Sequence, residues 1–172
     1  SKIQSLIRQE IQRHTEGNKA CITIKLNNLV DTELIDDLYR ASQAGVKIRL
    51  ICRGMCSLIP GIIGRSENIE VISIVDRFLE HPRVMVFENG GDRKVYISSA
   101  DWMVRNLSFR VETIFPIYDK TVYEELRNLV NIQLADNVKA RIINKKQDNP
   151  YVENKESKNR SQYAIYKALV NI

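Results

Sequence analysis

The chain has 172 residues with a formal net charge of +5, and 44% of them are hydrophobic. This length and apolar content predict one domain that can bury a sizeable core. No apolar run approaches the ~20 residues of a membrane span, and the opening SKIQSLIRQE lacks the regions of a signal peptide. We therefore expect a cytoplasmic domain, with peripheral attachment to a membrane left open. The basic charge favours polyanionic partners, which include nucleic acid, acidic lipid and phosphate chains.

The first third of the chain predicts a helix followed by a strand, a second helix and a second strand. Residues 3–14 carry apolar side chains at helical spacing, and the pattern stops before Gly17. A β-branched run covers 20–26, and Asp31 or Thr32 can cap a helix that ends at Gly45. With a strand at 46–52, this order is typical of a βαβ unit, which implies a right-handed crossover between parallel strands.

The remaining elements complete an α/β pattern. Residues 54–68 contain Pro60, Gly61 and Gly64 and are expected to form a long loop, of the kind that often carries function. Strands are predicted at 69–74, 83–88, 94–98, 110–117 and 138–143, and a helix at 120–134. The turn sequence Asn89-Gly90-Gly91-Asp92 predicts a hairpin between the second and third of these strands.

The segment after Asn149-Pro150 is different in composition. Residues 152–162 are charged and polar enough to be disordered, whereas YAIYKALVNI at the end of the chain favours a terminal helix. Both outcomes stay open for this polar tail.

The cysteines give no sign of a cross-linked or metal-bound fold. Cys21, Cys52 and Cys56 make an odd count without the spacing of a zinc site. A disulfide framework and a structural metal site are therefore not expected. We interpret the three side chains as reduced and mostly buried thiols.

Arg53-Gly54 stands at the carboxyl end of the second predicted strand, where open α/β sheets place ligand sites. A guanidinium there can hold phosphate oxygens with paired hydrogen bonds, and glycine lets a ligand approach the backbone. On position alone, a surface arginine at a strand end is the simpler explanation.

His81 and Arg83 flank Pro82 just before a predicted strand. Residues two apart in an extended chain point to the same side, so the imidazole and the guanidinium are expected to converge on one anion. A histidine can give or take a proton near neutral pH, or attack phosphorus. A lone histidine is nevertheless more often structural.

A polar cluster follows the strand at 94–98. Ser99, Asp101 and Asn106 can point into one crevice, where they would orient a histidine or contact phosphate. A turn in which serine and aspartate bond their own backbone is at least as consistent with the sequence.

Several long motifs run through the chain. They are KLNNLVD at 25–31, LYRASQAGVKIRLICRG at 38–54, SENI at 66–69, RFLEHPR at 77–83, SSADWMVRNLSFRVE at 98–112 and LADN at 134–137. Together they closely resemble the final domain of the long-chain bacterial polyphosphate kinases. The resemblance covers roughly residues 2–151, so we interpret 1–151 as the C-terminal catalytic domain of such a kinase. Residues 152–172 match nothing recognised.

The resemblance implies a phospholipase D-like α/β fold, with a mixed β-sheet flanked by helices, used in that family as two adjacent domains that share one active-site cleft. In the family, ATP phosphorylates a histidine in the preceding domain, the phosphoryl group passes to polyphosphate, and the reaction is reversible. Magnesium is required, and its protein ligands also lie in the preceding domain, so no metal ligand is predicted in this chain. By motif, Arg53 and His81 are ATP-contacting positions, and His81 is the predicted catalytic residue.

Further expectations follow from the resemblance. The partners are ATP or ADP, polyphosphate and the preceding domains of the same polypeptide, with a homo-oligomer in the full-length enzyme and no specific nucleic acid. The fragment alone is expected to be inactive. Arg83, Ser99, Asp101 and Asn106 are supporting residues.

Some positions depart from the expected patterns. Arg83 stands where phospholipase D proteins have lysine, and SSAD at 98–101 looks like a degenerate form of their small-Ser-x-Asn element. Asp76 and Pro82 also differ from the family pattern and put the geometry of the local loop in question. Two alternatives remain: a phosphodiesterase with His81 as nucleophile, and a non-catalytic nucleic-acid-binding module.

Overall fold

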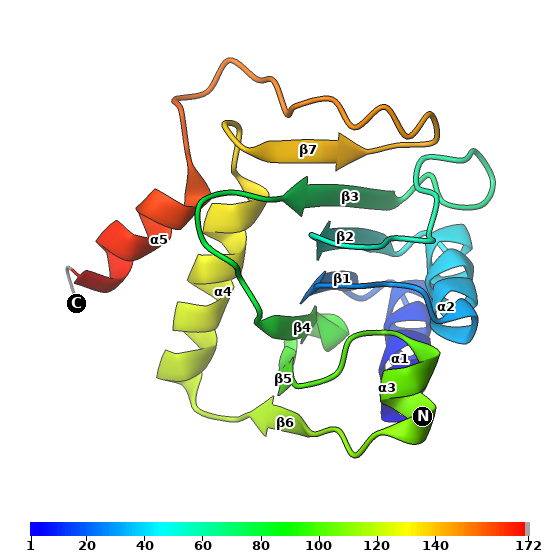
Figure 1. Ribbon diagram of the computed structural model, residues 1–172. Coiled ribbons are helices and arrows are strands. Elements are labelled where there is room, and N and C mark those ends of the chain that lie inside the picture. The colour runs from blue at the N-terminus through cyan, green and yellow to red at the C-terminus, as the bar shows by residue number, and fades with distance from the viewer. Residues whose placement is uncertain (171–172) are drawn as a thin grey trace.

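The computed structural model of the chain describes residues 1–170 as helices on both faces of a seven-stranded mixed sheet (Figure 1). The strand order is β6-β5-β4-β1-β2-β3-β7. The strands are β1 Cys21–Leu26, β2 Lys47–Cys52, β3 Ile69–Ile74, β4 Arg83–Phe87, β5 Lys94–Ser98, β6 Ile114–Ile117 and β7 Ala140–Ile143. The helices are α1 Lys2–Thr15, α2 Thr32–Gln43, α3 Val104–Phe109, α4 Lys120–Leu134 and α5 Ser161–Val170, with a short 3-10 turn at Asn89–Gly91.

The predicted α/β class and the central pairings are confirmed. β1 and β2 are parallel, with Cys21 opposite Lys47, and β3 continues the parallel set beside β2. β4 and β5 form the predicted hairpin, and β4 lies antiparallel to β1. At the other edge β7 is antiparallel to β3. This arrangement brings the carboxyl ends of β1 and β2 to the same edge as the start of β4 and the end of β5.

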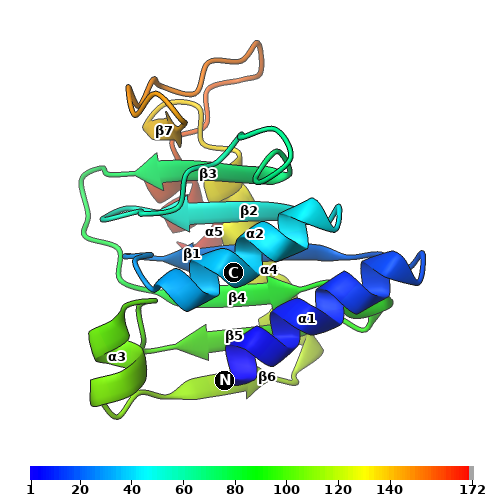
Figure 2. The same cartoon turned by 90° about the vertical axis from the view of Figure 1, so that its right-hand side faces the viewer.

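Two hydrophobic cores hold the layers together. α1 and α2 cover one face of the sheet, whereas α4 and α5 lie on the opposite face (Figures 1 and 2). The larger core packs Leu6, Ile7 and Leu38 of the first layer against Ile22 and Ile48 of the sheet. Full burial of each such side chain contributes about 1.5–3 kcal/mol, so this face provides most of the hydrophobic stabilisation. The core under α4 is smaller.

Some predicted boundaries were wrong. The strand predicted from residue 110 begins only at Ile114. Just before it, the Glu112 carboxylate and the Thr113 amide bond to the Ser99 side chain, and the Thr113 carbonyl accepts from the Ser99 amide. α3 was not predicted. The strand predicted from 138 starts at Ala140, since Asp136 Oδ1 accepts hydrogen bonds from the backbone amides of residues 138–140.

The polar tail takes one of its two predicted forms: α5 is a helix through Val170, and residues 171–172 lie outside the described part of the chain. It is tied back to the domain at several points. Arg160 pairs with Asp76 at 2.6 Å, the Ser161 amide donates to Asp136, and Gln162 exchanges hydrogen bonds with the Phe78 backbone. Within residues 1–170, no helix is long and apolar enough to cross a membrane.

Candidate functional site

The candidate site lies at the sheet edge where β1 and β2 end. Asn27 and Asn28 directly follow β1, and Arg53 and Gly54 follow β2. The antiparallel hairpin adds the segment before β4, which carries His81, and the segment after Ser98. The structure therefore brings together residues from segments that are far apart in the sequence.

Gly54 allows the two strand ends to approach closely. Its amide donates to the Asn27 carbonyl at 2.8 Å. A Cβ atom on Gly54 would lie 2.5 Å from Asn28 Oδ1 and 2.8 Å from the Asn27 carbonyl oxygen, closer than van der Waals contact allows. Glycine at this position is thus required by sterics, and it sets the direction in which Arg53 leaves the sheet.

The half-buried Arg53 guanidinium is anchored through one nitrogen. Arg53 Nε donates to Asn27 Oδ1 at 2.7 Å and to the Glu80 carbonyl at 2.6 Å. Among the described residues, no carboxylate lies within ion-pair distance of Arg53, and its two terminal nitrogens make no hydrogen bond to the protein. An oriented guanidinium with free terminal donors can bind two oxygens of one phosphate group.

Asp101 is buried and connects three segments of the site. Its carboxylate accepts hydrogen bonds from the backbone amides of Asn27 and Asn28 and from the Asn28 side chain, at 2.9–3.2 Å. Arg83 donates to both carboxylate oxygens through Nε and Nη2, at 3.1 Å each. Burial alone would raise the pKa of Asp101, but the hydrogen bonds from Arg83 and the two asparagines lower it to about 2. Asp101 therefore stays ionised and fixes the geometry of the strand ends.

The remaining donor of Arg83 holds His81. Arg83 Nη1 lies 2.7 Å from His81 Nδ1 and 3.2 Å from the His81 carbonyl oxygen. Because a guanidinium can only donate, His81 Nδ1 accepts in this contact, and Arg83 Nη2 also lies 3.5 Å from His81 Nε2. We expected both side chains to converge on one anion, and the structure differs. Arg83 already binds Asp101 and His81, so only the exposed imidazole faces solvent.

Ser99 and Asn106 belong to a neighbouring cluster around Glu112. Ser99 Oγ donates to one carboxylate oxygen of Glu112, and Asn106 Nδ2 donates to the other at 2.7 Å. These two hydrogen bonds lower the pKa of Glu112. Neither residue contacts His81 or Arg53, so this cluster shapes the loop from 99 to 113 beside the site.

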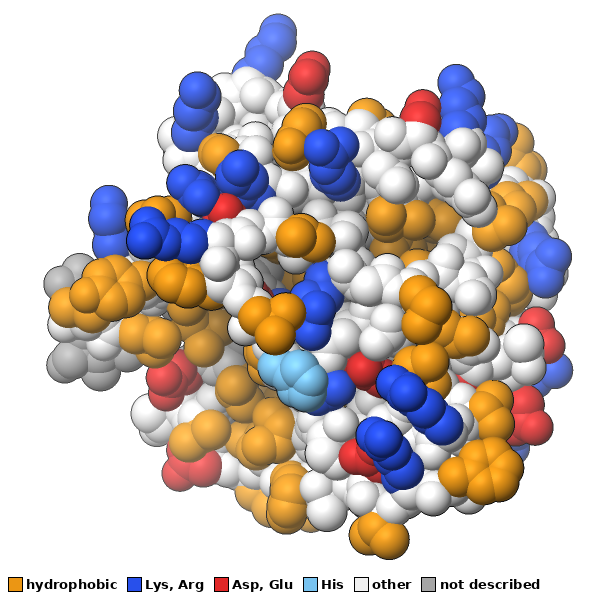
Figure 3. Space-filling view, in the orientation of Figure 1, with side chains coloured by type: hydrophobic (Ala, Val, Ile, Leu, Met, Phe, Trp, Pro, Cys, Tyr) orange, Lys and Arg blue, Asp and Glu red, His pale blue; other side chains and the backbone are white. Residues whose placement is uncertain are grey.

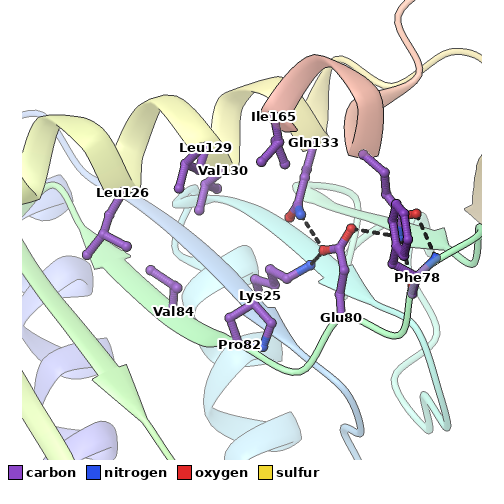
Figure 4. A pocket seen from close by; sticks show the side chains of 11 residues that line it. Lys25, Phe78, Glu80, Pro82, Val84, Leu126, Leu129, Val130, Gln133 and Ile165 are labelled. Carbon is purple, nitrogen blue, oxygen red and sulfur yellow. Dashed lines mark hydrogen bonds and ion pairs between the residues drawn. The ribbon is translucent and has the colours of Figure 1, made fainter. Parts of the chain in front are cut away.

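A buried ion pair lies beneath the site. Lys25 Nζ lies 2.5 Å from Glu80 Oε2, and Gln133 and Gln162 also donate to this carboxylate (Figure 4). Burial lowers the pKa of Lys25, and the bond to Glu80 opposes that effect. The network lies at one end of a pocket of about 280 Å³ whose other walls are largely apolar: Phe78, Pro82, Val84, Leu126, Leu129, Val130 and Ile165.

The pair connects the site to the helices on the far face of the sheet. Glu80 is bound through its side chain to Lys25 of β1 and through its carbonyl to Arg53.

On the surface, a histidine near the middle of the face in Figure 3 has basic side chains directly beside and above it.

Comparisons with known proteins identify the family of the chain. Residues 1–162 match the family model described as polyphosphate kinase C-terminal domain 2. The chain belongs to the polyphosphate kinase family. It is 54% identical to a polyphosphate kinase of Vibrio vulnificus, over all of this chain and 25% of that protein, and 50% identical to one of Escherichia coli, over 95% of this chain and 24% of that protein. The chain thus spans about a quarter of the length of the relatives it matches.

Solved structures confirm the predicted phospholipase D-like fold. The crystal structure of the polyphosphate kinase from Porphyromonas gingivalis superposes with a TM-score of 0.96 and 45% identity, over 99% of this chain and 26% of that one. Nuc of Salmonella typhimurium, a phospholipase D family member, superposes with a TM-score of 0.59 at 14% identity, over 83% of this chain and 88% of that one. That identity supports the fold alone.

The similarity also extends through the polar tail. Residues 152–172 matched nothing recognised by motif, but the Vibrio vulnificus alignment includes them. Asp76, which departs from the expected family pattern, pairs with Arg160 and so joins its loop to the start of α5.

The described residues do not offer a magnesium site. No group of three or more metal-ligating side chains occurs among residues 1–170. Two carboxylates of the site already have partners: Asp101 binds Arg83 and the two asparagines, and Glu80 binds Lys25 and the two glutamines. A hard cation needs free carboxylate or carbonyl oxygens, so these residues do not fit the ion that the family implies.

Proposed function

We propose that this chain is the part of a polyphosphate kinase that binds and orients phosphate groups during reversible transfer between ATP and polyphosphate. The observation that carries the proposal is the free end of the Arg53 guanidinium beside an exposed His81, in a domain that belongs to this family. The substrates are ATP or ADP and polyphosphate, and the phosphohistidine forms in a preceding domain of the same polypeptide.

Arg53 acts as a clamp in this proposal. Phosphoryl transfer depends on positioning the reacting groups and on neutralising the charge carried by the phosphate oxygens in the transition state. Asn27 and the Glu80 carbonyl fix the plane of the guanidinium before substrate binds. A pre-oriented clamp loses less conformational entropy on binding than a free surface arginine does.

His81 acts as a donor to the transferring phosphate. A histidine N–H can donate to a phosphate oxygen, and the exposed imidazole of His81, held by Arg83, is the group that takes this role. Arg83 and Asp101 are positioning residues: Asp101 orients Arg83, and Arg83 orients the imidazole of His81. The proposal places the enzyme in the cytoplasm as a homo-oligomer and leaves the magnesium ligands outside this chain.

The test is activity of the full-length kinase carrying Arg53→Met. Loss of the clamp lowers ATP-dependent polyphosphate synthesis by about 100-fold or more, with the melting temperature within about 2 °C of the parent. Arg8→Met is the matched control, because Arg8 is exposed on α1 at the opposite face. Normal turnover in Arg53→Met, or a loss of stability that accounts for the loss of activity, contradicts the proposal.

The 172-residue chain alone provides a second test. Because the proposed phosphohistidine lies outside it, the chain is expected to make no polyphosphate from ATP. Sustained synthesis by the purified chain would show that it holds the complete active site.

A further inference from the structure

A second polar pocket lies under α4, toward the other end of β1 and β2. Its volume is about 130 Å³, and three guanidinium groups, those of Arg49, Arg93 and Arg127, line it together with Tyr123 and Asn131. One carboxylate, Glu88, is in the lining. Arg49 and Arg53 are four residues apart along an extended chain, about 13 Å, and the pocket shares no residue with the Arg53 and His81 site.

The charges in this pocket are not balanced. Glu88 accepts from Arg93 at 2.8 and 2.9 Å, and Arg127 pairs at 2.6 Å with Glu124, which is outside the lining and 52% exposed. Arg49 has no carboxylate within ion-pair distance among residues 1–170; its Nη2 donates to the Thr23 hydroxyl at 3.1 Å.

Two of the pocket's donors also lack partners. Arg49 Nε and Arg127 Nε are buried and make no hydrogen bond in the described part of the chain. Arginine keeps its charge at any physiological pH, so a buried guanidinium N–H without an acceptor is costly. An anion in the pocket would satisfy both donors and neutralise Arg49.

We propose that Arg49, Arg93 and Arg127 form a second anion site that binds one phosphate group. A volume of about 130 Å³ has room for a phosphate group and is smaller than the pockets that hold a whole nucleotide. Three guanidiniums around a small polar cavity match a tetrahedral oxyanion, whose oxygens accept from several donors at once. The phosphate group can come from free phosphate, from a polyphosphate chain or from a nucleotide.

Thermal unfolding of the 172-residue chain tests the proposal, with orthophosphate, tripolyphosphate or ADP added at constant ionic strength and sodium chloride as the reference. Phosphate is expected to raise the melting temperature of the parent chain. In chains that also carry Arg53→Met, which removes any contribution of the Arg53 site, Arg49→Met abolishes that response, and the affinity for phosphate by calorimetry falls about tenfold or more. A response to orthophosphate shows that the site binds a single free phosphate group. A response only to tripolyphosphate shows that the group comes from a polyphosphate chain, and a response only to ADP shows that it comes from a nucleotide.

Two further variants test this site independently of the function proposed for Arg53 and His81. Arg53→Met keeps the Arg49-dependent response, so failure of one proposal does not decide the other. Without added anion, Arg49→Met melts at or above the parent temperature, because an unpaired buried charge has been replaced by an apolar side chain of similar length. If Arg49→Met does not fold, Arg127→Met takes its place, because the Arg127 side chain is 41% exposed. Arg127→Met should lose the same response to phosphate. An unchanged response in both arginine variants, or no response beyond chloride in the parent, overturns the proposal.

Discussion

Replacing Asp101 by asparagine tests how the strand ends are held. The substitution keeps the size of the side chain but removes the charge that faces Arg83, whose side chain is only 10% exposed. Loss of one partner from a buried pair typically costs about 3–5 kcal/mol, and we expect the lower end because asparagine still accepts one hydrogen bond. Urea unfolding of the 172-residue chain at pH 7 should therefore show a loss of about 3 kcal/mol.

The pH dependence of that loss identifies its cause. In the folded chain the pKa of Asp101 is lowered from 3.8 to about 2, and each pKa unit is worth about 1.4 kcal/mol. Because the folded-state pKa is the lower one, this stability is present above pH 4 and disappears as the pH falls through 2. Asparagine does not titrate, so the difference between parent and Asp101→Asn should shrink by about 1 kcal/mol at pH 3 and about 2 kcal/mol at pH 2.

A difference that stays constant from pH 7 to pH 2 would refute the reasoning, because the cost would then come from packing and not from charge. Asp92→Asn is the control for loss of a surface carboxylate, since Asp92 is exposed and makes no side-chain hydrogen bond among the described residues. It should change the unfolding free energy by less than about 0.5 kcal/mol.

Three further predictions concern the same edge of the sheet. Gly54→Ala should lower the unfolding free energy by about 1–3 kcal/mol in urea titrations, because its Cβ would lie 2.5 Å from Asn28 Oδ1; an unchanged midpoint would contradict this. Lys25→Met should cost about 3 kcal/mol by leaving the Glu80 carboxylate buried without a cation, and adding Glu80→Gln should recover more than half; a further loss in the double variant would argue against the ion pair. In the full-length kinase His81→Ala should fold normally and lose about 100- to 10,000-fold in turnover in both directions, and peptide mapping of the acid-labile phosphoenzyme should find no phosphate on the His81 peptide. Phosphate on that peptide would show that His81 is the nucleophile and not the donor.

The parts of the fold that local patterns determine were predicted correctly. The βαβ unit follows from β-branched runs on either side of an amphipathic helix with an Asp31 cap, and the structure shows that cap bonding to the Leu34 amide. The β4-β5 hairpin follows from the Asn-Gly-Gly-Asp turn, where Gly90 has a φ of 71°. The strand predicted at 110–117 failed at its first residues because their hydrogen bonds go to side chains, which residue propensity does not record.

Only part of the site could be predicted from the sequence. Arg53 and His81 were predicted by position and by family motif, but Asn27, which accepts from Arg53, was not singled out. A polar Asn27-Asn28 pair directly after a buried strand is a signal that could have found it. The hydrogen bonds of Asp101 with Asn27 and Asn28 could not be predicted, because they require knowing that β4 lies beside β1 and runs against it.

Lys25 shows why burial is harder to predict than secondary structure. In a strand that reads CITIKL, a lysine is most simply assigned to a solvated face. In the structure that face is covered by α4 and α5, and Glu80, fifty-five residues away in sequence, supplies the counter-charge. The environment of Lys25 is therefore set by long-range packing.

The most direct test of the central claim is the position of phosphate in a structure of the full-length kinase bound to a non-hydrolysable ATP analogue. We expect phosphate oxygens within hydrogen-bond distance, about 2.7–3.2 Å, of the terminal nitrogens of Arg53 and of a ring nitrogen of His81, with the Arg83 to Asp101 pair intact. Phosphates bound elsewhere, with Arg53 and His81 both facing solvent, would contradict it.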